Sequence, residues 1–535
     1  MGFKFIIYQI FFIVVVSFSY SVFSQNEATL DVSFDNDGFV SIPYDGINSI
    51  YPSFVEVLND NSYLVGVNTR HNNTKQCFLT KFYNDGTIDT NFGNNGRLIF
   101  ESIFTQDGTY TSNYISSIHK LDNDDFLVFG MFEDTYQVFK IDSNGNFLTQ
   151  FGNQGFKSLS EGSWGMSHTV LSDDKILTSY VKRIDSINEF KYGFSKYSND
   201  IELDTSFANN GNKILNITSQ TIDRVSKVLN YSDSTFITVG NSMPSMTFDQ
   251  GVVARFTYDG NLDPSFGTNG VIELNYNVLG VYTTLNDITI QQDNKILVCG
   301  RSLYNGGTGG QNYYASMPII IRYNADGSLD SSFDNGGIKI VSNTLFDAND
   351  NYTRIKVLPD NKILVLGYAS LPFPYMKTAV LLRRFHPDGS PDLSFGDDSY
   401  FFYFKTPNTT EDEGNGALGL EILENNKLLF LSFNEDNNSY TEGRMYRLHI
   451  NTLSNTQFNV SDIKYFPNPV DNVLNLESSF DISELSIYDL KGKLVMERND
   501  FLKSSIDVSK LSSGIYVVKL KDNFLKSHSF KIIKN

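Results

Sequence analysis

A short phrase returns seven times along this chain of 535 residues, and this internal repeat constrains the fold more than any other feature. Most copies have an Asp-x-x-Phe pattern that follows a turn and leads into Asn, Asp or Gly. Their aromatic residues are Phe34, Phe92, Phe151, Phe207, Phe266, Phe333 and Phe395, so the intervals are 58, 59, 56, 59, 67 and 62 residues. Self-similarity over tens of residues is typical of solenoids, propellers and similar arrays.

Each repeat contains four segments with the character of β-strands. A short alternating run follows the Phe, as in FVSIPY, and two apolar segments joined by a tight turn come next, as in DITIQQDNKILVCG. A last segment such as IIIRYNADG usually closes on Asn-Gly or Asp-Gly. Such turns between alternating apolar runs favour hairpins, and no helical periodicity interrupts them. The sequence therefore predicts an all-β protein.

Seven units of four strands predict a seven-bladed β-propeller over residues 25–460. A four-stranded sheet of this length cannot cover its own apolar faces, so the sheets must stack around an axis. An open β-solenoid is the alternative, although the units are long for one of its coils. Glycines close the strand after the turn in five units, which predicts a bulge or a close backbone approach there: Gly66, Gly130, Gly240, Gly300 and Gly367.

Basic and acidic residues recur at a fixed spacing on the last strand of each unit. The basic residues are Lys81, Lys140, Lys196, Arg255, Arg322, Arg384 and Arg447. Eight positions later stand Asp89, Asp204, Asp263, Asp330 and Asp392, with Leu148 and Asn455 as exceptions. We interpret these residues as structural inter-blade ion pairs that fix the turns. The alternative is a ring of basic residues that binds an anion at one mouth of the channel.

Asp31 precedes the first unit and has no basic residue eight positions before it. The chain ends of a closed ring meet, so Asp31 could serve Arg447 in place of the degenerate copy at Asn455. This spacing gives a hypothesis for how the ring closes.

The N-terminus predicts a secretory signal peptide over residues 1–24. Lys4 precedes an apolar run from 5 to 16, and small residues follow up to Ser24. A membrane anchor is the alternative, but the run is shorter than the roughly 20 residues that span a bilayer. The chain has two cysteines, too few for a disulfide framework.

The last 75 residues, 461–535, differ in kind from the repeats and predict a small Ig-like β-sandwich. Six or seven short strands alternate with turns such as Pro467-Asn468-Pro469 and Lys491-Gly492. Basic and acidic residues nearly balance here, at +1, and Lys4 adds another +1, so residues 25–460 carry about −21 of the chain's net charge of −19. An acidic body repels phosphate backbones and argues against nucleic-acid binding.

The repeat body and the C-terminal segment each resemble a known protein family. The phrase DGSLDxSFGxxG with its companion DNKILVxG resembles the delta-sixty type of bacterial β-propeller repeat, over about residues 29–458. The C-terminal segment resembles the type A C-terminal sorting domain of the type IX secretion system, on Pro467-Asn468-Pro469, Tyr488-Asp489-x-x-Gly492 and Leu511-x-x-Gly514-x-Tyr516. The resemblance implies a partner, the type IX secretion machinery, and a place at the outer-membrane surface or outside the cell. An ordinary Ig-like adhesion module is the alternative.

Catalytic, cofactor and metal sites are not predicted. The six histidines show no metal-ligand spacing, and the glycine cluster at 305–312 opens no helix. Asp142-x-Asn144-x-Asn146 and Asp85-Gly86-x-x-Asp89 faintly resemble calcium loops, so structural calcium is a weak possibility that turn chemistry explains first.

The sequence favours a non-enzymatic binding or adhesion propeller with an unknown extracellular ligand, glycan or protein. The alternatives are a polysaccharide-active or other hydrolytic enzyme and a structural envelope or matrix protein. Carboxylates outside the repeat pattern at the channel mouth would indicate an enzyme, and exposed aromatics would indicate a binder. The candidate binding residues outside the repeat pattern are Trp164, Tyr304, Tyr313, Tyr314, Phe373 and Tyr375.

Overall fold

The structure is a computed structural model in which the chain forms two compact units, Met1–Thr452 and Leu453–Asn535. It describes residues 28–42, 49–71, 74–100, 113–132, 135–159, 164–184, 189–218, 222–243, 249–274, 282–305, 314–341, 350–370, 378–396, 400–403, 414–435, 441–450, 463–478, 482–489, 494–499, 505–522 and 527–535. The predicted signal peptide and the predicted boundary between residues 460 and 461 lie outside these residues.

The described strands of unit 1 group into six antiparallel sets of four and a seventh set of five, which we number in chain order. Sets 1 to 3 are β3 (Ser49–Val57), β4 (Tyr63–His71), β5 (Thr74–Phe82) and β6 (Arg97–Phe100); β7 (Tyr114–Lys120), β8 (Phe126–Phe132), β9 (Thr135–Ile141) and β10 (Phe156–Ser158); β11 (Trp164–Val170), β12 (Ile176–Ile184), β13 (Glu189–Tyr197) and β14 (Asn212–Leu215). Sets 4 to 6 are β15 (Ile222–Asn230), β16 (Thr235–Met243), β17 (Gln250–Thr257) and β18 (Val271–Glu273); β19 (Tyr282–Ile290), β20 (Ile296–Asn305), β21 (Tyr314–Tyr323) and β22 (Ile338–Ile340); β23 (Asn351–Val357), β24 (Ile363–Ser370), β25 (Thr378–Phe385) and β26 (Tyr400–Tyr403).

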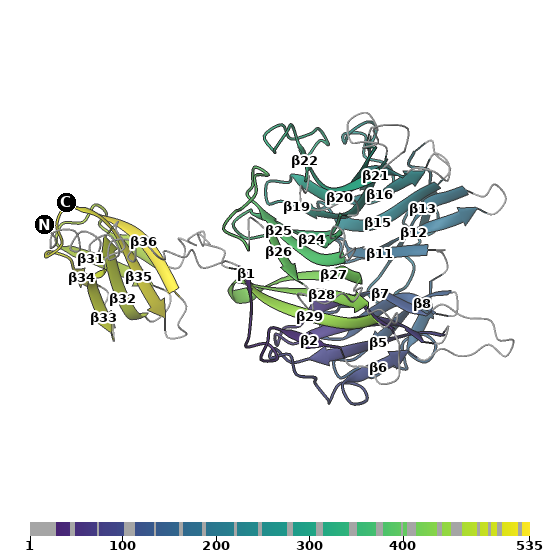
Figure 1. The fold of residues 1–535 in the computed structure, drawn as a ribbon, viewed down its shortest axis with the longest axis horizontal. Helices are drawn as coiled ribbons and strands as arrows, with labels where there is room; N and C mark the ends of the chain where they lie inside the picture. The colour runs from purple at the N-terminus through teal and green to yellow at the C-terminus, as the bar shows by residue number, and fades with distance from the viewer. Residues whose placement is uncertain are drawn as a thin grey trace, which may run out of the picture. The chain divides into compact units, whose positions relative to one another are not determined.

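Set 7 combines the two ends of unit 1. Its strands β27 (Gly414–Leu423), β28 (Lys427–Glu435) and β29 (Thr441–Ile450) come late in the chain. The N-terminal strands β1 (Ala28–Leu30) and β2 (Phe39–Ser41) both pair antiparallel with β29. Figure 1 shows purple β2 beside yellow-green β29. The outer strand of set 7 is thus supplied by the N-terminal segment.

The first strands of the sets form a closed cycle. β3 lies next to β7, and the contacts continue through β11, β15, β19, β23 and β27 back to β3. Seven hydrophobic clusters lie between consecutive sets, one at each interface of the cycle, the interface between sets 7 and 1 included. Burial of each Val, Leu, Ile or Phe side chain stabilises such a core by roughly 1.5–3 kcal/mol.

Asn and Asp residues shape the turn between the first and second strands. Asn61, Asp124, Asp174, Asn294 and Asn361 adopt positive φ values between 58° and 64° at equivalent places. Short polar side chains tolerate this left-handed conformation better than other non-glycine residues. The Asp-Asn and Asn-Asp pairs of the sequence are therefore a requirement of the turn.

The glycines of the second strands face a bulge in the first strand. The register shifts between Leu285 and Asp287 where β19 pairs with β20, and similar shifts occur in the other sets. A Cβ atom on Gly300 would lie 1.9 Å from the Thr284 carbonyl oxygen, and one on Gly367 would lie 1.9 Å from that of Asn351. The bulged backbone therefore occupies the space that a side chain would need.

Unit 2 consists of two sheets on a common core. One sheet contains β30 (Ile463–Phe466), β31 (Val473–Ser478) and β34 (Ser505–Asp507). The other runs in the order β33 (Leu494–Asn499), β32 (Ile482–Asp489), β35 (Gly514–Asp522) and β36 (Ser527–Lys534). Residues of both sheets, among them Leu474, Ile506, Ile487 and Val518, pack together in the core.

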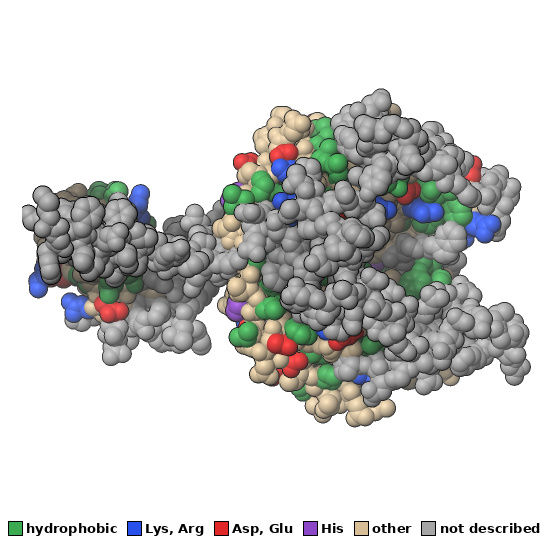
Figure 2. All heavy atoms as spheres, in the orientation of Figure 1, with side chains coloured by type: hydrophobic (Ala, Val, Ile, Leu, Met, Phe, Trp, Pro, Cys, Tyr) green, Lys and Arg blue, Asp and Glu red, His purple; other side chains and the backbone are tan. Residues whose placement is uncertain are grey.

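Helix is almost absent from the described residues. The helical element there is the 3-10 turn Glu424–Asn426 between β27 and β28, and no helix in this part of the chain is long and apolar enough to cross a membrane. Figure 2 shows acidic and basic side chains interspersed over the visible described surface of unit 1.

Candidate functional site

The repeated charged residues meet in a compact contact that we call the clasp. In set 5, Arg322 Nε donates to Asp330 Oδ2 at 2.8 Å, and Arg322 Nη2 donates to Ser332 Oγ at 3.1 Å. The other oxygen of Asp330 accepts bonds from the Ser332 backbone N–H and hydroxyl at 3.0 and 2.7 Å. The guanidinium carbon lies 4.7 Å from the centre of the Phe333 ring. Charge-assisted hydrogen bonds and a cation–π contact thus hold the turn to the strand.

The clasp recurs with the same geometry in three other sets. The Arg–Asp distances are 2.8 Å for Arg255–Asp263, 2.7 Å for Arg384–Asp392 and 2.7 Å for Arg447–Asp31. In each set the guanidinium also lies over the Phe of the repeated phrase, at 4.6 to 4.8 Å.

A lysine from the preceding hairpin binds the same aspartate in three sets. Lys295, Lys362 and Lys427 follow the Asn-containing turns and lie 3.1, 2.8 and 2.8 Å from Asp330, Asp392 and Asp31. The aspartate therefore lies between two cations, and the sequence-based prediction named only one of them.

The clasp also reaches the next set. Arg255 donates to the Ala325 carbonyl oxygen and Arg322 to that of Pro387. The Phe of the repeated phrase packs beneath a glycine in a turn of the following set. For example, a Cβ atom on Gly389 would lie 2.9 Å from the Phe333 ring. These glycines have positive φ, so a larger residue would be both strained and obstructed.

At the seam between sets 7 and 1, the N-terminal segment completes a clasp of the same kind. Asp31 bonds to Arg447 and Lys427, and the backbone N–H of Asp31 donates to the Arg447 carbonyl oxygen at 2.9 Å. Arg447 also donates to Tyr63 Oη at 3.1 Å and to Asn84 Oδ1 at 2.9 Å, both in set 1. One arginine thus joins the segment around Asp31, set 7 and set 1.

Sets 1 to 3 depart from this geometry. Lys81 lies 3.4 Å from Asp89, but Lys196 pairs with Asp173 at 2.6 Å while Ser206 holds Asp204. Lys140, whose set has Leu148 in place of Asp, lies 3.5 Å from Asp200 of the next set. The ammonium group of lysine is a compact charge without the rigid planar fork of a guanidinium, which explains the looser pairing.

The clasps perturb the carboxyl groups that they contain. Burial alone would raise the pKa of Asp330, but hydrogen bonds from Ser332 and Lys295 and the charge of Arg322 hold it well below its usual range. The same balance lowers the pKa of Asp392 and that of Asp31. These aspartates are ionised and fully engaged, so the repeated charges leave little for a ligand.

Charged residues outside the repeat pattern gather on the first strands, in a group that we call the central arc. Lys356, Glu421, Glu56 and His119 occupy the same position on the consecutive strands β23, β27, β3 and β7. Lys356 Nζ binds both oxygens of Glu421, at 3.0 and 2.9 Å. The equivalent residues of the other sets are Thr169, Leu229 and Thr289.

Glu56 is the unusual member of the central arc. Burial and the charge of Glu421 raise its pKa to about 7, against the opposing effect of Lys356 and Lys120. Burial also lowers the pKa of the neighbouring His119, although Asp122 partly opposes the shift. His168 is stacked on Phe129 at 4.4 Å, and burial lowers its pKa to about 3. The arc therefore combines two carboxyl groups in different environments, while the half-buried His168 is held by Phe129 and by a hydrogen bond with Ser117.

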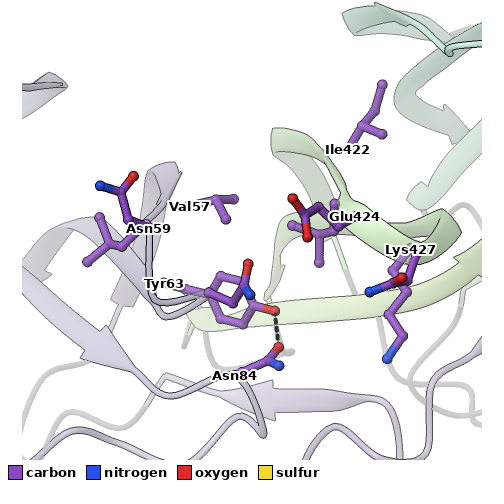
Figure 3. A pocket seen from close by; sticks show the side chains of 11 residues that line it. Val57, Asn59, Tyr63, Asn84, Ile422, Glu424 and Lys427 are labelled. Carbon is purple, nitrogen blue, oxygen red and sulfur yellow. Dashed lines mark hydrogen bonds between the residues drawn. The ribbon is translucent and has the colours of Figure 1, made fainter. Parts of the chain in front are cut away.

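A pocket of about 370 Å³ opens between sets 7 and 1, and we call it the seam pocket. Figure 3 shows Asn59 and Glu424 on opposite sides of it, with Tyr63 hydrogen-bonded to Asn84 between them. Its lining residues are Val57, Leu58, Asn59, Asn61, Tyr63, Asn84, Ile422, Leu423, Glu424, Asn425 and Lys427. The sequence motifs do not reveal this pocket, because its walls come from turns that are distant from one another in the chain.

The six predicted binding aromatics cannot be compared with this pocket. Tyr313, Phe373 and Tyr375 lie outside the described residues, and of Trp164, Tyr304 and Tyr314 only the backbone is described, at the ends of β11, β20 and β21.

The calcium-like sequences form turns. Asp142 Oδ1 accepts the backbone N–H groups of Asn144 and Asn146 at 2.9 and 2.8 Å, and Asp85 accepts that of Thr87. Within the described part of the chain, no group of three or more His, Cys, Asp or Glu residues is placed to hold a metal ion.

Family models match both units. Residues 464–535 match the secretion system C-terminal sorting domain, which is the type IX sorting domain, and residues 232–266, 291–333 and 358–395 match a β-propeller domain of unknown function, DUF5122. Each of the last three stretches ends on the Phe of an Arg–Asp clasp. The chain thus carries β-propeller repeats and a type IX sorting domain, which indicates export to the cell surface or the extracellular space.

Comparison with other proteins adds no functional assignment. No curated protein matches the sequence. Similar solved structures include the polysaccharide lyase Uly1, with 8% identity, a TM-score of 0.44 and coverage of 80% of this chain and 98% of that one. The β-propeller domain of the Trilobed protease from Pyrococcus furiosus has 9% identity, a TM-score of 0.38 and coverage of 77% and 99%. Drosophila Semaphorin 1a has 10% identity, a TM-score of 0.39 and coverage of 90% and 98%. At these values the similarities carry no argument about activity.

Replacing Arg322 by Met should destabilise unit 1 by about 3 kcal/mol, because Asp330 would lose its main buried partner. Chemical denaturation measures the change in the free energy of unfolding. Lys191→Met, which breaks a contact with Glu189 on the same strand, is the control and should change it by less than ~1 kcal/mol. Equal effects of the two substitutions would contradict the structural role of the clasp.

Stability should depend on pH in two opposite ways. The clasp aspartates have folded-state pKa values below the roughly 3.9 of an unfolded chain, so their contribution is present above pH ~4 and is lost as the pH falls further. The raised pKa of Glu56 predicts the reverse between pH about 7 and about 4, where protonation stabilises the fold. Denaturation midpoints from pH 8 to 2.5 test both effects, and Glu56→Gln should remove only the second. An unchanged profile in that variant would contradict the assignment.

Proposed function

We propose that this protein is a secreted or surface-bound, non-enzymatic binding protein, built as a closed seven-bladed propeller in which each set is a blade. Export follows from the sorting domain. The closed cycle of first strands and the core cluster at every interface support the ring. Each clasp would hold one blade to the next, and the ring would present a rigid surface to an extracellular ligand.

The observation that carries the binding role is the division between repeated and non-repeated polar groups. The repeated Arg, Lys, Asp and Ser side chains bond to one another within the clasps. Polar groups outside the pattern line the seam pocket, where Asn59, Asn84 and Glu424 are exposed. Because these groups lie outside the clasp aspartates and remain accessible, they support a role in ligand recognition.

A second candidate function, hydrolysis of a polysaccharide or other substrate, rests on the central arc. Glu56 and Glu421 are carboxyl groups outside the repeat pattern on adjacent first strands, and their environments differ. Two carboxyl groups in different environments are what general acid and base catalysis needs. This observation favours the alternative over a purely structural envelope protein.

One experiment separates the two functions. The exported chain is screened on an array of glycans and matrix proteins and is incubated in parallel with a panel of polysaccharides, with Glu56→Gln as a matched variant. The binding role predicts that a ligand is retained equally by both proteins and that no products are released. Absence of any ligand, together with hydrolysis that Glu56→Gln abolishes, would overturn it in favour of the enzyme.

A further inference from the structure

The seam pocket differs from the equivalent space between sets 5 and 6. Between sets 5 and 6, a space of about 630 Å³ is lined by Gln291, Gln292, Asp293, Lys295, Arg322, Ser332, Asp360, Asn361, Pro387 and Asp388. That space has three aspartates, and Pro387 is the apolar residue of its lining. The seam pocket instead has four asparagines and, within a mostly polar lining, a small apolar wall of Val57, Leu58, Ile422 and Leu423. The seam pocket lies at the interface where the N-terminal segment binds the last strand of set 7.

The polar rim of the seam pocket consists mainly of amides. Asn59, Asn61, Asn84 and Asn425 are exposed and come from three different turns. An amide side chain carries both a donor and an acceptor, which matches a hydroxyl group that also does both. Tyr63 donates to Asn84 Oδ1 at 2.8 Å, and Asn59 donates to Asp124 at 3.3 Å. These bonds hold two of the amides in place before a ligand arrives.

The charges around the seam pocket balance, so they give an anionic ligand no net attraction. Lys427 is the cation of the lining, and it shares Asp31 with Arg447, at distances of 2.8 and 2.7 Å. Glu424 is exposed at the rim of the pocket and adds a negative charge. The whole chain also has a net charge of −19, which repels anions over longer distances. A sulfated or uronic-acid ligand would therefore be disfavoured.

We propose that the seam pocket binds a neutral carbohydrate, with the asparagine amides and Glu424 bonded to its hydroxyl groups and the apolar wall against its C–H face. A volume of about 370 Å³ suits one or two sugar residues at the end or along the side of a longer chain. This inference rests on the proposed binding function and names its ligand class.

The test uses the full exported chain and an array of neutral, sulfated and uronic-acid oligosaccharides, followed by calorimetry on the best neutral ligand. Asn59→Ala and Glu424→Ala should each weaken binding about tenfold or more, since each removes hydrogen bonds to the ligand. Both residues are exposed, so their denaturation midpoints should match that of the parent protein. The matched control is Gln292→Ala, in the space between sets 5 and 6, and it should leave the affinity unchanged.

Each other outcome overturns the inference. Neutral-glycan binding that both seam variants retain would place the site elsewhere, and a preference for sulfated or uronic-acid glycans would contradict the charge argument. Binding to matrix proteins alone would refute the carbohydrate site and leave the proposed binding function intact. Absence of every ligand would refute both.

Discussion

The interfaces of the later sets of unit 1 depend on one contact, the bond between an arginine on the third strand and an aspartate that, in sets 4 to 6, stands eight residues later. That contact closes the turn after the strand, places the Phe of the phrase beneath the guanidinium, and lets the same arginine reach the backbone of the next set. A buried ion pair of this kind adds little net stability over an apolar core, but removing one partner is costly. We infer that the clasp mainly fixes register and orientation between neighbouring sheets, while the hydrophobic clusters supply most of the stability.

The seam uses the same contact to join distant parts of the chain. β1 and β2 pair with β29, and Asp31 takes the place that an aspartate eight residues after Arg447 would otherwise fill. Closing a ring in this way orders a long loop at a modest additional cost in entropy, because that cost grows only slowly with loop length. It also makes the interface between sets 7 and 1 chemically different from the others. The seam pocket and two members of the central arc lie at this interface.

Local spacing and long-range packing differ in how far they can be read from the sequence. An Arg and an Asp that stand eight residues apart belong to one strand and the turn after it, so the sequence shows their pairing directly. The same spacing leaves Asp31 without a basic residue before it, and this predicts Asp31 as the partner of Arg447. Lys295 and Lys362 were not foreseen because each comes from the hairpin before its aspartate. Lys196 binds Asp173 rather than Asp204. Both carboxylates are within its reach, and the spacing in the sequence does not show which of them it binds. Glu56 and Glu421 come from opposite ends of the repeat array, so only the closed cycle of first strands brings them together.

The central claim is that the N-terminal segment closes the ring through a clasp equivalent to the internal ones. A double-mutant cycle with Asp31→Asn and Arg447→Met, compared with the same cycle at Asp330 and Arg322, tests it most directly through the free energy of unfolding. We expect coupling energies of about 1–3 kcal/mol at both places, in agreement within ~0.5 kcal/mol. A coupling near zero at Asp31 and Arg447, with the internal coupling intact, would contradict closure by the N-terminal segment.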